Sequence, residues 1–277
     1  MKRNLRYQLL LLLLVQAFSS LSQDRKIVKN GSFYFSWGYN KEWYSPSSIH
    51  IVQSSLGNDY TFEDTQAHDR IGWDRLFSSA LTIPQYNYRI GYFFNKNQDL
   101  AIELSFDHTK FIVGQGQIVH VSGKMHETDV DKDILITDSV LMYQLNNGAN
   151  FFLVNLVKKV DINSLSCTNG KMKTSLLLKG GIGPVIPHVE NTIFTKANIP
   201  HFQFGGWNTG VEIALKTVFF NHVYLEFCNK VDYARYSNLR IYQGLADHSF
   251  FTYELILNLG YTFKLGKDCV NCPEKTN

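Results

Sequence analysis

The chain has 277 residues, a formal net charge of +3, 18% charged residues and 44% apolar residues. Disordered chains combine low hydrophobicity with a high net charge, so this composition excludes that class. The small net charge, with no Lys/Arg run beyond pairs after the N-terminus, also argues against a nucleic-acid-binding protein, and no nucleic-acid partner is expected.

The first 22 residues predict an N-terminal export signal. Three basic residues precede an unbroken apolar run, Leu9–Val15, and small residues follow it. This run is about half of the ~20 apolar residues that a membrane-spanning helix needs. Ser20-Leu21-Ser22 predicts cleavage after Ser22. We therefore expect residues 1–22 to be a cleaved signal peptide.

After the signal, apolar and polar residues alternate with a period of two. Eight segments show the pattern: 33–40, 85–94, 100–107, 152–156, 175–182, 207–216, 223–230 and 251–263. Such alternation indicates β-strands rather than helices. Several segments exceed the five or six residues typical of soluble sheets and match the roughly 9–11 residues with which a tilted strand crosses a bilayer. No apolar stretch of 18 residues follows the signal, which argues against membrane helices.

The connections between these strands alternate in length. Asn95–Asp99 and Asn221–His222 are short turns, and Lys159–Met172 is of middle length. The long connections are 44–81, 114–146, 184–204 and 235–249. Short turns on one side and long loops on the other are typical of bacterial outer-membrane barrels. Two apolar patches, Ile118–Val121 and Ile134–Ile136, either extend a hairpin above the membrane or raise the strand count from eight to ten.

One face of each strand is apolar and the other carries the charges. A charge facing lipid costs roughly 2–4 kcal/mol at the midplane, so we expect the charged face to point inward. An eight-stranded barrel is just wide enough for side chains to fill it, so these charges should pair and plug the lumen. The alternative is a soluble exported sandwich or barrel with its apolar face inward. The predicted lumen charge network, four acids and four bases, consists of Arg89, Glu103, Lys179, Glu212, Lys216, Glu226, Lys230 and Glu254.

Aromatic residues are concentrated at the strand ends, and the last strand ends in Leu259-Gly260-Tyr261-Thr262-Phe263. Over residues 31–265 the chain resembles the small outer-membrane β-barrel proteins of Gram-negative bacteria, of the porin-family β-barrel-domain type. The resemblance implies an all-β, closed antiparallel transmembrane barrel over 23–266 and a periplasmic tail over 267–277. It also implies location in the outer membrane, contact with lipid and lipopolysaccharide, and assembly by the barrel-assembly machinery. It implies no single activity.

The cysteines predict a disulfide on the periplasmic side. Cys269 and Cys272 form a C-x-x-C pair in the tail, and Cys167 lies in the middle-length link. A bridge is expected in the oxidising periplasm, either within the C-x-x-C pair or from Cys167 to one of its members, and the alternative is that these thiols stay free. Only half of a four-ligand zinc site is visible, so no metal site is expected.

Asp129, Asp131 and Asp133 have the spacing that opens a calcium-binding loop. The pattern then requires Gly and Glu at the positions held by Ile134 and Val140. We therefore interpret this segment as a solvated loop face.

The histidines are the remaining candidates for catalytic residues. Neighbouring residues such as His248 and Ser249 point to opposite faces of a strand, so a catalytic triad would have to assemble across loops, for instance from His68, Asp247 and Ser249 at the outer rim. No G-x-S-x-G motif is present. The sequence favours a structural or surface-binding role through the long outer loops, with no cofactor. The alternatives are a lipid A-modifying acyl hydrolase or transferase at the rim, and a narrow channel for small solutes.

Overall fold

The computed structural model describes residues 31–70, 85–95, 97–162, 165 and 172–264, and the rest of the chain is not described. These residues form antiparallel β-structure, which confirms the predicted all-β class. No helix in these ranges is long and apolar enough to cross a membrane.

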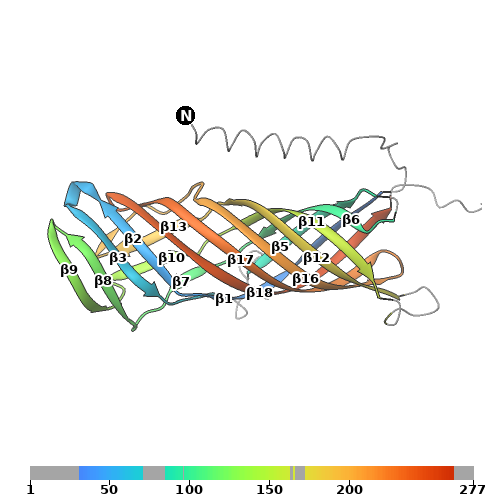
Figure 1. Cartoon of the computed structure of the whole chain (residues 1–277), viewed down its shortest axis with the longest axis horizontal. Helices are drawn as coiled ribbons and strands as arrows, with labels where there is room; N and C mark the ends of the chain where they lie inside the picture. The colour runs from blue at the N-terminus through green and yellow to red at the C-terminus, as the bar shows by residue number, and fades with distance from the viewer. Residues whose placement is uncertain (1–30, 71–84, 96, 163–164, 166–171, 265–277) are drawn as a thin grey trace, which may run out of the picture.

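Eight strands correspond to the eight alternating segments of the sequence. They are β1 (Ser32–Tyr44), β5 (Tyr86–Phe93), β6 (Leu100–Asp107), β11 (Phe151–Asp161), β12 (Met172–Val185), β16 (Gly206–Phe219), β17 (Val223–Ile241) and β18 (Gly244–Lys264). Each strand pairs with the next in this order. The last strand, β18, also pairs with β1, from Ser32 opposite Lys264 to Tyr44 opposite Thr252. The pairings therefore return to their first strand, and we call this part of the molecule the barrel (Figure 1).

Two short turns join neighbouring strands at one end of the barrel, which we call the turn end. In the first, the Asn95 side-chain oxygen accepts hydrogen bonds from the backbone N–H groups of Asp99 (3.0 Å) and Leu100 (2.9 Å). In the second, Phe220 and Asn221 both have positive φ, and the His222 backbone N–H donates to the Phe219 carbonyl oxygen at 3.1 Å, which closes the turn. The prediction of short turns at Asn95–Asp99 and Asn221–His222 is confirmed.

The predicted long loops are largely strands, which corrects the sequence-based expectation. A first set continues the barrel sheet beyond its opposite end: β2 (Ser47–Gln53), β3 (Asn58–Thr65), β8 (Ile118–Met125) and β9 (Thr128–Leu135), with the 3-10 turn η1 (Ser54–Leu56). A second set forms a separate sheet: β4 (Ala67–His68), β7 (Phe111–Val113), β10 (Leu141–Leu145), β13 (His188–Ile193) and β14 (Lys196–Ala197), with β15 (His201–Phe202) paired to β13.

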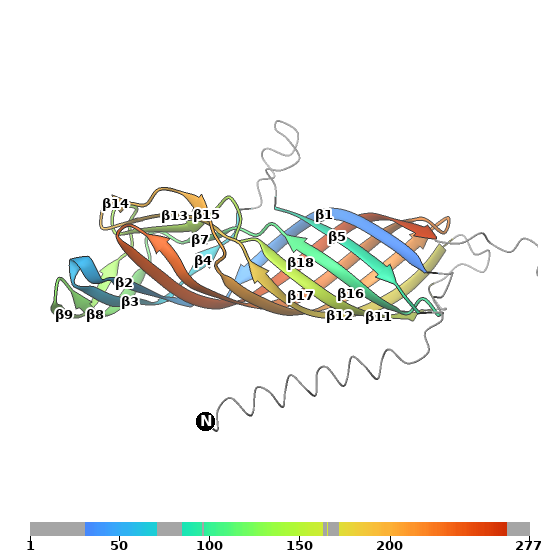
Figure 2. The same cartoon turned by 90° about the horizontal axis from the view of Figure 1, so that it is seen from above.

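These two sets lie opposite each other in two layers, together with the far part of the β17–β18 hairpin (Figure 2). We call this part the extension. Its core is apolar and joins both layers: the Phe111 ring of the second sheet stacks on Phe250 of β18, with 4.5 Å between ring centroids. The patches Ile118–Val121 and Ile134–Ile136 lie in or beside the β8–β9 hairpin, which pairs with β3 and not with the barrel ring. The hairpin alternative is therefore the observed one.

The barrel strands present their apolar rows to the outside. Val211 is 66% exposed and Leu156 59%, whereas the side chains of Arg89 and Lys179 are fully buried. A sandwich with its apolar face inward is therefore contradicted for the barrel strands. The reason is strand geometry. Successive side chains of a strand point to opposite faces, so once one residue faces outward, the faces of all other residues in that strand are fixed.

Aromatic rings encircle the barrel exterior near the extension. Successive contacts include Trp43–Tyr253 (5.7 Å between centroids), Phe251–Tyr233 (5.0 Å) and Phe106–Phe152 (4.7 Å). At the turn end, further rings meet in the pairs Phe33–Tyr92 (4.5 Å) and Tyr261–Phe263 (4.8 Å). Rings at both ends of the apolar wall match the aromatic girdles of membrane-spanning barrels.

Candidate functional site

The barrel interior holds a continuous network of ionisable side chains. One row crosses five strands in register: Lys179 on β12 faces Glu212 on β16, which faces Lys230 on β17, which faces Glu254 on β18. Charges of opposite sign therefore alternate between strand neighbours, the arrangement in which cross-strand pairs attract. The row ends at Glu42 on β1, which faces Glu254 and breaks the alternation.

Lys179 makes ion pairs with three carboxylates of the network. Its Nζ lies 2.7 Å from Glu226, 2.9 Å from Glu212 and 3.1 Å from Glu103. Cys228 lies beside Glu212 and Glu226, and these three residues have the donor atoms of a possible metal cluster. The ammonium group of Lys179 already contacts both carboxylates, so it supplies the positive charge at this position.

Arg89 and Lys230 join the network to a second group of acids. Arg89 contacts Asp107 at 2.5 Å, Glu212 at 3.6 Å and Glu103 at 3.8 Å. Lys230 contacts Asp107 at 2.7 Å and Glu254 at 3.2 Å, and it also pairs with Asp232.

All eight residues named from the sequence thus lie inside the barrel and make ion pairs. Lys216 makes the longest of these contacts, 3.9 Å to Glu226.

The expected balance of four acids and four bases is wrong, because three further acids are buried in the interior. Asp107 and Asp232 enter the network through Arg89 and Lys230, and Glu42 lies beside Glu254. The surplus carboxylates are met by neutral donors: the Tyr34 hydroxyl donates to Glu103 (2.8 Å), and Tyr44 (2.6 Å) and Gln85 (2.9 Å) donate to Glu42. The alternation in the sequence already places Asp107 on the same strand face as Glu103, and Asp232 on the same face as Lys230.

The structure does not bring the three rim candidates together. His68 on β4 has Nδ1 2.8 Å from the Asp69 carbonyl oxygen, and Asp247 accepts the Asn238 backbone N–H at 2.6 Å. The Ser249 carbonyl oxygen accepts the Ser47 hydroxyl at 3.0 Å. Among the described residues, no hydrogen bond or ion pair joins His68, Asp247 and Ser249.

A different serine–histidine contact occurs in the extension. His248 Nδ1 lies 3.2 Å from Ser47 Oγ, and the His248 ring stacks on Tyr236 at 4.9 Å. Both residues of the pair are buried, and burial lowers the pKa of His248 to about 3. No carboxylate among the described residues contacts the ring, so the group that would orient a catalytic base is missing at this pair.

The triplet Asp129, Asp131 and Asp133 lies on β9, a strand rather than a loop. His120 on the neighbouring strand β8 contacts Asp131 and Asp133, each at 2.9 Å. The hydrogen bond with Asp133 raises the pKa of His120. Cys167, Cys269 and Cys272 lie outside the described residues, whereas Cys228 is a buried free thiol.

The extension also carries a hollow of about 400 Å³ on its surface. It is lined by Ala197, Asn198, Ile199, His201, Arg240, Ile241, Tyr242 and Gln243. Within this lining Ile199 is 87% exposed, and Phe202, the next residue after His201 in the chain, is 59% exposed. The Asn198 side chain donates to the carbonyl oxygens of Val189 (3.2 Å) and Arg240 (3.3 Å), so hydrogen bonds fix the segment that carries these apolar groups. Sequence reasoning did not identify this surface.

No family model and no curated protein matches the sequence. The similar solved structures are outer-membrane β-barrel proteins of Gram-negative bacteria. The attachment invasion locus protein Ail of Yersinia pestis is 13% identical, with 84% of this chain and 99% of that chain covered and a TM-score of 0.33. Neisserial surface protein A is 10% identical, with 83% and 97% covered and a TM-score of 0.32. The outer membrane protease OmpT from Escherichia coli is 9% identical, with 87% and 99% covered and a TM-score of 0.37.

Proposed function

We propose that the chain is an integral outer-membrane protein: a closed, eight-stranded barrel with a plugged lumen that holds a binding surface outside the cell. The turn end faces the periplasm and the extension faces outward. The proposal is supported by the exposed apolar wall, by aromatic rings at both of its ends, and by the antiparallel pairing of β18 with β1. The export signal, its cleavage after Ser22, and contact with lipopolysaccharide and the assembly machinery stay predictions.

The plug is a testable part of this proposal. The interior ion pairs fill the space that a channel would need, so protein in planar bilayers should show no steady conductance. A defined single-channel conductance of the wild type would contradict the plug and favour the channel alternative. Migration on a gel before and after boiling tests the barrel itself, since compact barrels change their mobility only when they unfold.

The binding role rests on one observation, the hollow with the exposed Ile199 in its lining and the exposed Phe202 next to His201 in the chain. Exposed apolar groups beside a concave surface are typical of interaction sites, and here they stand on an ordered segment in the part of the molecule assigned to the outside. We infer that the hollow binds an apolar segment of a partner protein or peptide. Fixing the segment beforehand lowers the entropy cost of binding.

Peptide selection on the protein in lipid nanodiscs tests this role. Phage-displayed peptides enriched on the wild type should contain apolar or aromatic residues. The double variant I199S/F202S should bind them at least about tenfold more weakly, since each buried large apolar side chain contributes about 1.5–3 kcal/mol. The control is I118S, which removes another exposed isoleucine, on β8. Enrichment no greater than on empty nanodiscs, or equal losses in both variants, would overturn the assignment.

A further inference from the structure

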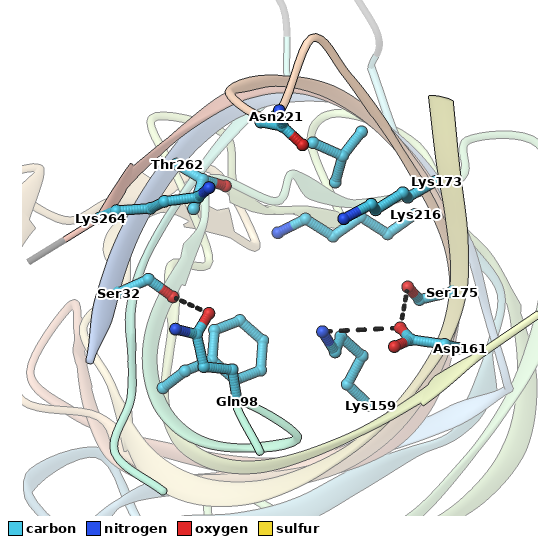
Figure 3. Close-up of a pocket in the computed structure, with 12 residues that line it drawn as sticks. Ser32, Gln98, Lys159, Asp161, Lys173, Ser175, Lys216, Asn221, Thr262 and Lys264 are labelled. Carbon is cyan, nitrogen blue, oxygen red and sulfur yellow. Dashed lines mark hydrogen bonds and ion pairs between the residues drawn. The ribbon is translucent and has the colours of Figure 1, made fainter. Parts of the chain in front are cut away.

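The turn end of the barrel contains a cavity that is separate from the extension and its hollow. It has a volume of about 180 Å³ and is lined by Ser32, Phe93, Gln98, Lys159, Asp161, Lys173, Ser175, Lys216, Val218, Asn221, Thr262 and Lys264. Figure 3 shows the labelled side chains around one central space inside the ring of strands. We call this cavity the vestibule.

Positive charge dominates the vestibule. Lysines reach it from four strands, β11, β12, β16 and β18, and the lining contains a single carboxylate, Asp161. Four ammonium groups and one carboxylate give a formal charge of +3. Asp161 is partly satisfied by its own neighbours, because it accepts the Ser175 hydroxyl at 2.8 Å and lies 3.5 Å from Lys159 Nζ.

Lys216 closes the inner end of the vestibule. Its side chain is only 4% exposed, and its Nζ donates no hydrogen bond to any described residue. The Nζ lies 3.5 Å from the Tyr224 ring centroid and 4.3 Å from that of Tyr34, and the nearest carboxylate of its ion pair is 3.9 Å away. Aromatic faces attract the ammonium group but leave its N–H donors unused.

Two glycines make this aromatic layer possible. A Cβ at Gly91 would lie 2.1 Å from the Tyr34 ring, and a Cβ at Gly260 would lie 2.2 Å from the Tyr224 ring. The two tyrosines can therefore lie against the barrel wall, under the Lys216 ammonium group. A buried ammonium with unused donors is costly unless a ligand or water accepts from it.

We propose that the vestibule is a binding site for a small multivalent oxyanion of the phosphate or pyrophosphate class. The lining offers several lysine point charges and a formal charge of +3, which suits a multiply charged phosphate better than a singly charged carboxylate. The Thr262 hydroxyl and the Asn221 amide lie around the same space, and the Ser32 hydroxyl donates to Gln98 at 3.1 Å. The inference goes beyond the proposed function and holds whichever side of the membrane the vestibule faces.

The phosphate group that binds in the vestibule could belong to a soluble anion or to a lipid headgroup, and the experiment has to distinguish the two. The lysine side chains point into the lumen and away from the apolar wall, so the soluble anion is expected. Pyrophosphate binding should therefore be equally strong in nanodiscs of zwitterionic lipid and in nanodiscs containing phosphatidylglycerol. Loss of pyrophosphate binding only in the anionic nanodiscs would assign the site to a lipid headgroup and overturn the soluble-anion proposal.

Neighbouring lysines on β11 provide a matched pair of variants. Lys159 lines the vestibule, whereas Lys158 lies on the outside and pairs with Asp99. Calorimetric titration with pyrophosphate, in a neutral detergent and a phosphate-free buffer, should show saturable binding to the wild type. Lys159→Met should weaken it about tenfold, the loss expected for one charge-assisted hydrogen bond. Lys158→Met should leave it unchanged.

Lys173→Met is a second vestibule variant, at a more exposed position, and should weaken binding in the same direction. The boiling-dependent gel shift checks that each variant keeps its barrel. No saturable binding of pyrophosphate or inorganic phosphate at millimolar concentration would overturn the proposal, as would equal effects of Lys158→Met and Lys159→Met in folded protein.

Discussion

Along β18 the buried face changes character within four residues, from Glu254 in the barrel to Phe250 in the extension. The outward face changes in the opposite sense, from Tyr253 to Ser249. The barrel thus has charged groups inside and apolar groups outside, whereas the extension has an apolar core and an outer surface on which polar residues are mixed with exposed apolar ones. The contrast teaches that the surroundings of each region select its buried chemistry. Where the outer wall of a sheet faces hydrocarbon, polar side chains are placed in the interior. Where the wall faces water, apolar side chains are placed in the interior.

The largest effect is expected where a buried ion loses its partners. Lys179→Met leaves Glu103, Glu212 and Glu226 without their shared cation, and removing one partner of a buried pair costs about 3–5 kcal/mol. Denaturant titration of the folded protein, read by the gel shift, measures this loss. Lys158→Met removes an exposed pair and should cost only about 0–1 kcal/mol. Equal stabilities of the two variants would mean that the interior network is not what holds the barrel.

A core substitution in the extension should have a local effect. Leu145 is fully buried in the apolar core on β10, and truncation of such a leucine to alanine costs about 2–5 kcal/mol. We expect Leu145→Ala to increase hydrogen exchange in β7, β10 and β13 while the barrel keeps its gel shift. Loss of the gel shift would show that the two regions unfold as one unit.

An apolar-to-arginine substitution on each of the two outer surfaces tests which surface faces lipid and which faces water. Leu156 and Ile199 are both exposed, but we place Leu156 against lipid and Ile199 in water. Leu156→Arg should destabilise the barrel by about 2–4 kcal/mol in lipid vesicles, and Ile199→Arg should leave its stability unchanged. If both arginines were tolerated equally, the apolar wall would not face a membrane.

A further prediction is a pH dependence confined to the extension. The folded protein holds the pKa of His248 at about 3, below the unfolded value of about 6.5, because the ring is buried. Protons then bind preferentially to the unfolded chain, so the stability of the extension should fall as the pH drops from about 6.5 towards 3. Thermal melting followed by tyrosine fluorescence measures this, and His248→Phe should flatten the dependence in that range.

His120, in the same region, should contribute a pH dependence of stability with the opposite sign. The carboxylate of Asp133 raises the pKa of His120, so its contribution is present at low pH and is lost as the pH rises through the raised pKa. NMR titration should show the pKa of His120 falling towards its usual range in Asp133→Asn. An unchanged pKa in that variant would remove Asp133 as the cause.

Much of the barrel could be predicted from the alternation alone. The eight strands, the side of each residue and the interior position of Arg89, Lys179 and Glu212 follow from a period of two. Asp107 and Asp232 were missed for a simple reason. Asp107 is the last residue of the predicted segment 100–107 and is not part of the predicted charge network, and the predicted seventh strand ends at Lys230, although β17 continues to Ile241.

The sequence by itself determined the strand period and therefore which side chains share a face, because that relation is local. Only the tertiary structure decided what those faces meet. The extension core, the Ser47–His248 contact, the hollow at Ile199 and the lysine vestibule all join segments distant in the chain. Cross-strand register and the packing of one sheet on another set these contacts, and neither is encoded in the alternation of any single strand.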